Sequence, residues 1–156
     1  MVTNYQSMKE ATIDYALRAT WQAVARMYNE EAKNFDSTMA VGFTLLSIDP
    51  KMGTPSTSLG PKMGMEATSL SRILKSMEEK GLILRKPNPK DGRGVLIYLT
   101  DFGLEKRNDS KSTVLRFNEA VKQEVSEEKL SSFFEVTDII NKLISDKKLF
   151  SKDISN

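Results

Sequence analysis

Apolar residues recur along this chain mostly at helical spacing, so most of the expected elements are helices. Residues 8–33 keep their apolar side chains on one face, which predicts a long first helix. A second helix is expected to be capped by Ser37 and to end near Asp49, because Pro50 forbids easy continuation. The apolar faces of these two helices consist of Ile13, Leu17, Trp21, Val24, Tyr28, Val41, Leu45 and Ile48.

Two short helices and two strands are predicted in the middle of the chain. After a loop over residues 49–57, the helices span about 56–63 and 67–80, and each precedes a glycine that can end it. The runs 82–86 and 95–100 are rich in β-branched and aromatic residues and predict strands joined by a hairpin loop. This order predicts a winged helix-turn-helix, a mainly α fold with a small β-hairpin wing.

Two further helices are predicted after residue 100. The first runs from Asp101 to about Glu124, and Ser126 can cap the second. Apolar residues cover more than one face of the last helix, and such a helix must be covered on most sides. We therefore expect a homodimer, in which a second copy of the chain covers it; the alternative is coverage by the first helix of the same chain. These apolar residues are Leu130, Phe133, Phe134, Val136, Ile139, Ile140, Leu143 and Ile144.

The composition argues against catalysis and against a membrane protein. The chain has no cysteine and no histidine, which removes the thiol nucleophile, the usual general base and the commonest transition-metal ligands. We therefore expect no enzyme, no metal and no cofactor. No apolar run approaches the roughly 18–20 residues of a spanning helix, and the first residues show no secretion signal. A cytoplasmic protein is expected.

Positive charge is concentrated in the middle of the chain, although the net charge of the whole chain is only +2. Between Lys80 and Arg93 there are five cations and one anion. Such a cluster is a local electrostatic footprint for an anionic partner. The alternative is a solvated surface that is rich in lysine.

The helix at 67–80 has an apolar back and a polar front that suit the major groove of DNA. Small hydroxyl side chains near its start let the backbone approach the duplex. Arg72 is expected to bind guanine, whereas Lys75 and Lys80 are expected to contact phosphates. The predicted DNA contacts of this helix are Thr68, Ser69, Ser71, Arg72 and Lys75.

The hairpin loop carries two of the cations, Lys90 and Arg93, at its tip. Arg93 is the candidate for insertion into a narrow minor groove, which attracts arginine. Gly92 and Gly94 are expected to remove obstructing side chains and to supply unusual φ angles. Asp91 is expected to pair with a nearby arginine and orient it. The alternative is an Asp-Gly turn whose charges are only solvated.

The segment from Ser58 to Gly103 resembles the DNA-binding core of the MarR family of bacterial transcription regulators. The motifs that carry the resemblance are ATSLSRILKSMEEKGLILRK, Asp91-Gly92-Arg93, and Leu99-Thr100 with Gly103. The resemblance implies a homodimer on a pseudo-palindromic operator in double-stranded DNA, usually a repressor that a small ligand releases.

The resemblance also implies that different regions of the chain have different functions. Residues 37–100 are expected to form the DNA-binding lobe, and residues 1–36 and 101–156 a helical dimerisation region. Four aromatic residues of the first two helices are candidates for a pocket that binds the small-molecule effector, although an aromatic stripe is more often plain core. They are Tyr15, Trp21, Tyr28 and Phe43. The alternative function is a winged-helix module that binds a protein and has no affinity for DNA.

Overall fold

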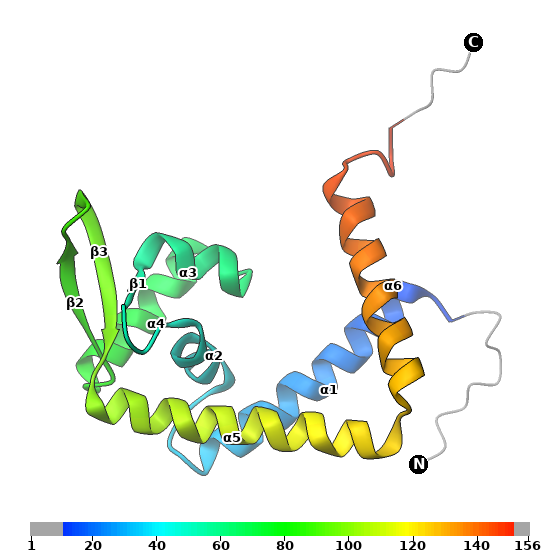
Figure 1. Ribbon diagram of the computed structural model, residues 1–156, viewed down its shortest axis with the longest axis horizontal. Helices are drawn as coiled ribbons and strands as arrows, with labels where there is room; N and C mark the ends of the chain where they lie inside the picture. Colours follow the sequence, from blue (N-terminus) through cyan, green and yellow to red (C-terminus); the bar gives the residue numbers. More distant parts are fainter. Residues whose placement is uncertain (1–10, 152–156) are drawn as a thin grey trace. The chain divides into compact units, whose positions relative to one another are not determined.

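The structure is a computed structural model that describes residues 11–151. Its elements are α1 (Ile13–Lys33), α2 (Met39–Ser47), β1 (Thr54–Pro55), α3 (Ser56–Met63), α4 (Ala67–Glu79), β2 (Ile83–Asn88), β3 (Asp91–Leu99), α5 (Asp101–Glu124) and α6 (Glu127–Ser145) (Figure 1). The chain divides into two compact units whose boundary lies inside α5, between Thr113 and Val114. The mainly α fold with a β-hairpin wing is confirmed.

The first two helices lie where they were predicted, with one correction at a helix cap. The start of the predicted first helix, residues 8–10, lies outside the described residues. The cap of α2 is Thr38, whose hydroxyl accepts a hydrogen bond from the Val41 N–H at 3.2 Å, so the prediction of Ser37 was wrong. Ser37 instead continues the turn that ends α1, since its own N–H donates to the Ala32 carbonyl at 2.9 Å.

Helices α3 and α4 form the predicted pair of short helices, and both end as predicted. Gly64 and Gly81 have φ angles of 60° and 74°, which glycine adopts without strain. The apolar face of α4 packs into a core to which α2, α3 and the sheet also contribute. The buried residues of this core are Leu45, Ile48, Leu59, Leu70, Leu74, Met77, Leu82, Ile83 and Ile97.

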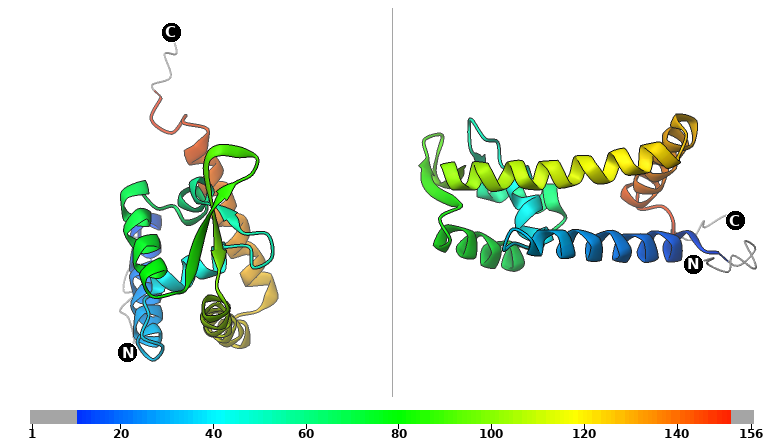
Figure 2. Two further views of the ribbon diagram at one scale, coloured as in Figure 1. Left: turned by 90° about the vertical axis from the view of Figure 1, so that its left-hand side faces the viewer. Right: turned by 90° about the horizontal axis from the view of Figure 1, so that it is seen from below.

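The antiparallel sheet has the strand order β1-β3-β2 and is larger than predicted. Strand β1 lies in the stretch that was predicted to be a loop, where Thr54 pairs with Ile97. Thr54 is buried and its hydroxyl accepts a hydrogen bond from the Asp49 N–H at 2.8 Å. Strands β2 and β3 almost meet at the tip of the hairpin, so only residues 89–90 connect them. Figure 2 shows this hairpin as a separate arm beside the helices.

The Leu-Thr-x-x-Gly motif joins the start of α5 to the beginning of β2. The Thr100 N–H donates to the Leu82 carbonyl at 3.1 Å, and the Thr100 hydroxyl accepts from the Gly103 N–H at 2.9 Å. A Cβ atom on Gly103 would overlap the Leu82 carbonyl oxygen. The glycine is therefore required by close packing of two backbones.

Helix α6 lies in the second unit and has no buried residue. Ser126 caps it as predicted, by accepting a hydrogen bond from the Lys129 N–H at 3.3 Å. Its exposed apolar residues are Phe133, Phe134, Val136, Ile139, Leu143 and Ile144. This helix therefore presents an uncovered apolar face. Among the described residues, no helix combines the length and the apolarity needed to cross a bilayer.

Candidate nucleic-acid interface

Helix α4 separates its apolar residues from its polar ones. Leu70, Leu74 and Met77 are at most 5% exposed, so the helix is fixed to the core along its back. The five polar residues predicted to contact DNA are all exposed on its front: Thr68, Ser69, Ser71, Arg72 and Lys75. No side chain caps its first turn, and that turn contains no acidic residue. The N–H groups at this end therefore have no side-chain partner, and the cap residue beside them is the acidic Glu66.

The wing holds Lys90 and Arg93 in exposed positions at and beside its tip. The Asp91 carboxylate accepts a hydrogen bond from the backbone N–H of Arg93 at 3.1 Å. The carboxylate therefore fixes the backbone beneath this arginine, whereas the expected contact was an ion pair with a nearby arginine. The Asn88 side chain accepts from the Lys90 N–H at 3.0 Å and closes the turn.

The two wing glycines do not supply the unusual φ angles that were predicted. Within residues 11–151, the glycines with positive φ are Gly53, Gly64 and Gly81, and none of them lies in the wing. Gly94 has a different use, because a Cβ atom there would lie 3.2 Å from a carboxylate oxygen of Asp91. The absence of a side chain at Gly94 leaves space for the Asp91 carboxylate beside the strand.

One ion pair at this surface was not predicted from the sequence. Arg85 on β2 and Glu78 on α4 approach to 3.2 Å between Nε and Oε2. The two residues are seven positions apart in the sequence, on either side of the turn at Gly81 that joins α4 to β2. Their opposite charges were the sequence feature from which this ion pair could have been predicted. Arg85 therefore partly neutralises the negative charge of Glu78, which lies one helical turn after Lys75.

Comparison with known proteins places this winged helix in a family. Residues 38–95 match the family model of MarR. This match covers the winged helix and leaves out the long helices on either side of it. The HTH-type transcriptional regulator YdgJ of Bacillus subtilis (strain 168) is 39% identical over 59 residues, which are 38% of this chain and 36% of that protein. The match therefore spans about a third of this relative's length.

Solved structures share the MarR fold over most of the chain. A Staphylococcus aureus MepR–DNA complex has a TM-score of 0.77 at 22% identity, covering 86% of this chain and 99% of that one. The regulator SlyA has a TM-score of 0.78 at 20% identity, covering 88% and 96%. PcaV of Streptomyces coelicolor with its natural ligand has a TM-score of 0.73 at 19% identity, covering 85% and 93%. YdgJ, SlyA and PcaV are each named as transcriptional regulators, which agrees with the prediction that this chain is not an enzyme.

The four aromatic residues predicted to line an effector pocket are not gathered at one place. Tyr28 and Phe43 form an edge-to-face pair with 5.5 Å between ring centroids, and burial raises the pKa of the Tyr28 hydroxyl. Tyr15 and Trp21 are 60% and 54% exposed. Tyr15 lies thirteen residues before Tyr28 on α1, about 20 Å along the helix axis.

Proposed function

We propose that this protein is a sequence-specific regulator of transcription that binds double-stranded DNA through α4 and the wing. The observation that carries the proposal is the arrangement of α4, with a buried apolar back and an exposed front of hydroxyl and basic residues. A helix of this kind fits the major groove, which is roughly 12 Å wide. Residues 37–100 are the DNA-binding lobe in this proposal.

The exposed side chains divide into those that read bases and those that bind the backbone. Arg72 donates to O6 and N7 of a guanine, while Lys75 and Lys90 contact phosphates. Arg93 enters the minor groove next to the recognition helix. The bond from its N–H to Asp91 supports this role, because it fixes the backbone from which the side chain extends.

The regulator acts as a homodimer in this proposal, with residues 1–36 and 101–156 as the dimerisation region. Exposed apolar residues on both terminal helices support it, including Trp21 at 54%, Phe134 at 59% and Ile144 at 59%. A second copy related by a two-fold axis covers these faces. It also presents two α4 helices to half-sites about 34–36 Å apart on a pseudo-palindromic operator. The protein acts in the cytoplasm as a repressor that a small effector releases.

Fluorescence anisotropy with the protein's own promoter fragment tests the proposal. We expect log K to fall linearly with log salt, with a slope of about −0.9 for each phosphate neutralised. Sedimentation of the free protein should give the mass of two chains. Absent or salt-independent binding, together with a protein partner retained after nuclease treatment, would instead establish a protein-interaction module.

Two variants separate the roles of the basic residues. Arg72→Ala should cost about 1–3 kcal/mol of binding and relax discrimination at one base pair. Arg93→Ala should weaken binding to all sequences and reduce the salt slope by about 1. Lys111→Ala is the matched control, because Lys111 is exposed and belongs to α5, outside both α4 and the wing. If the two arginine variants bind as the control does, the assignment of these residues is wrong.

A further inference from the structure

The only Asp-Gly pair in the sequence, Asp91-Gly92, lies at the tip of the wing. Both residues are exposed, and among the described residues a Cβ atom on Gly92 would meet nothing within 4 Å beyond its chain neighbours. The register of the described hairpin is irregular between Pro87 and Asn88, and residues 92–94 are not paired with β2 in it. The backbone amide of Gly92 is therefore accessible and lies at a bulge rather than in the regular ladder of the sheet.

The side chain of Asp91 is folded toward the amide that follows it. Its carboxylate accepts the hydrogen bond from the Arg93 N–H at 3.1 Å. This bond closes a small ring of atoms that includes the Gly92 nitrogen, so the ring holds the Asp91 Cγ atom close to that nitrogen. Gly94 leaves the space that this conformation needs, because a Cβ atom there would lie 3.2 Å from a carboxylate oxygen of Asp91.

We propose that Asp91-Gly92 is a site of spontaneous isomerisation to isoaspartate. The Gly92 nitrogen attacks Asp91 Cγ and forms a C–N bond, while the carboxyl OH leaves as water with the amide proton, which gives a cyclic imide. Water then opens the imide at one of its two carbonyl carbons. Attack at Cγ restores aspartate. Attack at the main-chain carbonyl carbon breaks its bond to the Gly92 nitrogen, so the chain then runs through Cβ and Cγ. The water that was lost is regained, and the mass is unchanged.

The modification changes the backbone directly before Arg93. The main chain gains one methylene group, and the carboxyl group that accepted the hydrogen bond from the Arg93 N–H becomes a main-chain carbonyl. Arg93 therefore loses the contact that fixes its backbone. Since Arg93 is the residue proposed to enter the minor groove, we expect the isomerised protein to lose that contact with DNA. This consequence rests on the proposed function, whereas the isomerisation itself does not.

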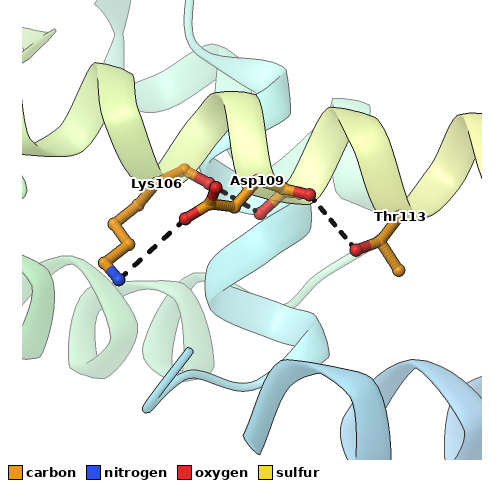
Figure 3. A network of polar contacts seen from close by, with 4 residues as sticks. Lys106, Asp109 and Thr113 are labelled. Atoms are coloured by element: carbon orange, nitrogen blue, oxygen red, sulfur yellow. Dashed lines mark hydrogen bonds and ion pairs between the residues drawn. The ribbon is translucent and has the colours of Figure 1, made fainter. Parts of the chain in front are cut away.

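Two Asp-Ser pairs in the same chain serve as internal controls, because serine, like glycine, is a small residue that hinders the attack little. In Asp36-Ser37, the serine N–H donates a hydrogen bond to the Ala32 carbonyl at 2.9 Å. Asp109-Ser110 lies inside α5, where the Asp109 carboxylate approaches the Lys106 ammonium at 4.0 Å and the Asp109 carbonyl accepts from the Thr113 hydroxyl at 3.1 Å (Figure 3). These contacts hold both backbones in place, so both pairs should stay unmodified.

Ageing of the full chain at physiological temperature tests the proposal, with digestion and mass spectrometry that separates isoaspartyl from aspartyl peptides. We expect isoaspartate to accumulate at Asp91 and not at Asp36 or Asp109. Gly92→Val is the matched variant, because the site has room for a side chain and a β-branched residue suits a strand but hinders the attack. It should slow the accumulation severalfold. Absence of isoaspartate at Asp91, equal accumulation at the Asp-Ser pairs, or an unchanged rate in Gly92→Val would overturn the proposal.

Operator binding by fresh and aged protein separates this proposal from the proposed function. The aged parent should bind more weakly, with a salt slope smaller by about 1, as expected for Arg93→Ala, and aged Gly92→Val should keep its affinity. Treatment with an isoaspartyl methyltransferase and S-adenosylmethionine, which returns isoaspartate to aspartate, should restore the parent.

The outcomes for the two proposals differ. If the fresh protein binds its operator and no isoaspartate forms at Asp91, the modification proposal fails and the regulator stands. If isoaspartate forms there without weakening operator binding, the proposed effect on the wing is overturned. If isoaspartate accumulates as expected and the fresh protein binds no operator, the modification site stands and the regulator fails.

Discussion

Replacement of Gly103 by alanine tests whether the close contact between α5 and β2 holds the winged helix together. The Cβ atom that alanine adds would overlap the Leu82 carbonyl oxygen and lie 2.9 Å from the Leu82 carbonyl carbon. Both are backbone atoms, and the neighbouring Ile83 is fixed by its pairing with Leu99. The collision can be relieved only if α5 or the strand moves.

Three effects decide the magnitude of the destabilisation. Overpacking of a rigid site costs about 1–3 kcal/mol, and a rigid backbone puts this case near the upper end. A displaced helix start also loses the hydrogen bond from the Gly103 N–H to Thr100, which is worth about 1 kcal/mol. Alanine returns about 1 kcal/mol through its higher helix propensity. We therefore expect the free energy of unfolding to fall by about 2–3 kcal/mol.

Urea denaturation followed by circular dichroism measures this change, at one protein concentration because the chain is proposed to dimerise. Gly42→Ala is the matched control. It also adds a methyl group to a helix, but the nearest atom is the Ser110 hydroxyl at 3.1 Å, which can rotate away. Its effect should stay within about 1 kcal/mol of the parent. An unchanged midpoint for Gly103→Ala, or a larger loss for the control, would refute the reasoning.

Two further predictions concern charge and pH. Glu78→Gln should change the free energy of unfolding by less than about 1 kcal/mol, because the ion pair between Glu78 and Arg85 is exposed. The same variant should strengthen operator binding, because Arg85 is then free to contact a phosphate. An unchanged dependence of operator binding on salt would contradict this expectation. Burial raises the pKa of Tyr28 above 10.0, because the folded protein favours the neutral hydroxyl over the phenolate. The stability that Tyr28 contributes is therefore fully present below about pH 10 and is lost as the pH rises through the pKa of the folded state. Tyr28→Phe should therefore flatten the fall of unfolding free energy above about pH 10.

The helices could be predicted from the sequence because their signals are local. The bounds of α3 and α5 agree with the predicted ranges, since each follows from nearby caps, glycines and apolar spacing. The exposed front of α4 was predictable for the same reason, because burial of Leu70, Leu74 and Met77 leaves the other positions outside. The helical spacing of apolar residues was therefore enough to predict which residues of α4 are exposed in the candidate interface.

The features that could not be predicted depend on contacts between distant residues. Strand β1 has two residues, and nothing local distinguishes it from a loop; it forms because Thr54 meets Ile97. A pocket of about 440 Å³ lies between Phe35 in the α1–α2 loop and Lys106 on α5, two residues some seventy positions apart that no sequence pattern connects. The contact of Asp91 with a backbone N–H, rather than with an arginine side chain, could not be predicted, because composition gives no clue to it.

Leu82 connects three parts of the molecule that were described separately. Its N–H donates to the Met77 carbonyl at 2.9 Å, which ties it to the end of α4. Its carbonyl accepts from the Thr100 N–H and adjoins Gly103, which ties it to the start of α5. Its side chain lines the pocket. Leu82 therefore links the end of α4 to the start of α5 through short backbone contacts. The close approach that Gly103 makes possible is thus one half of this link between α4 and α5.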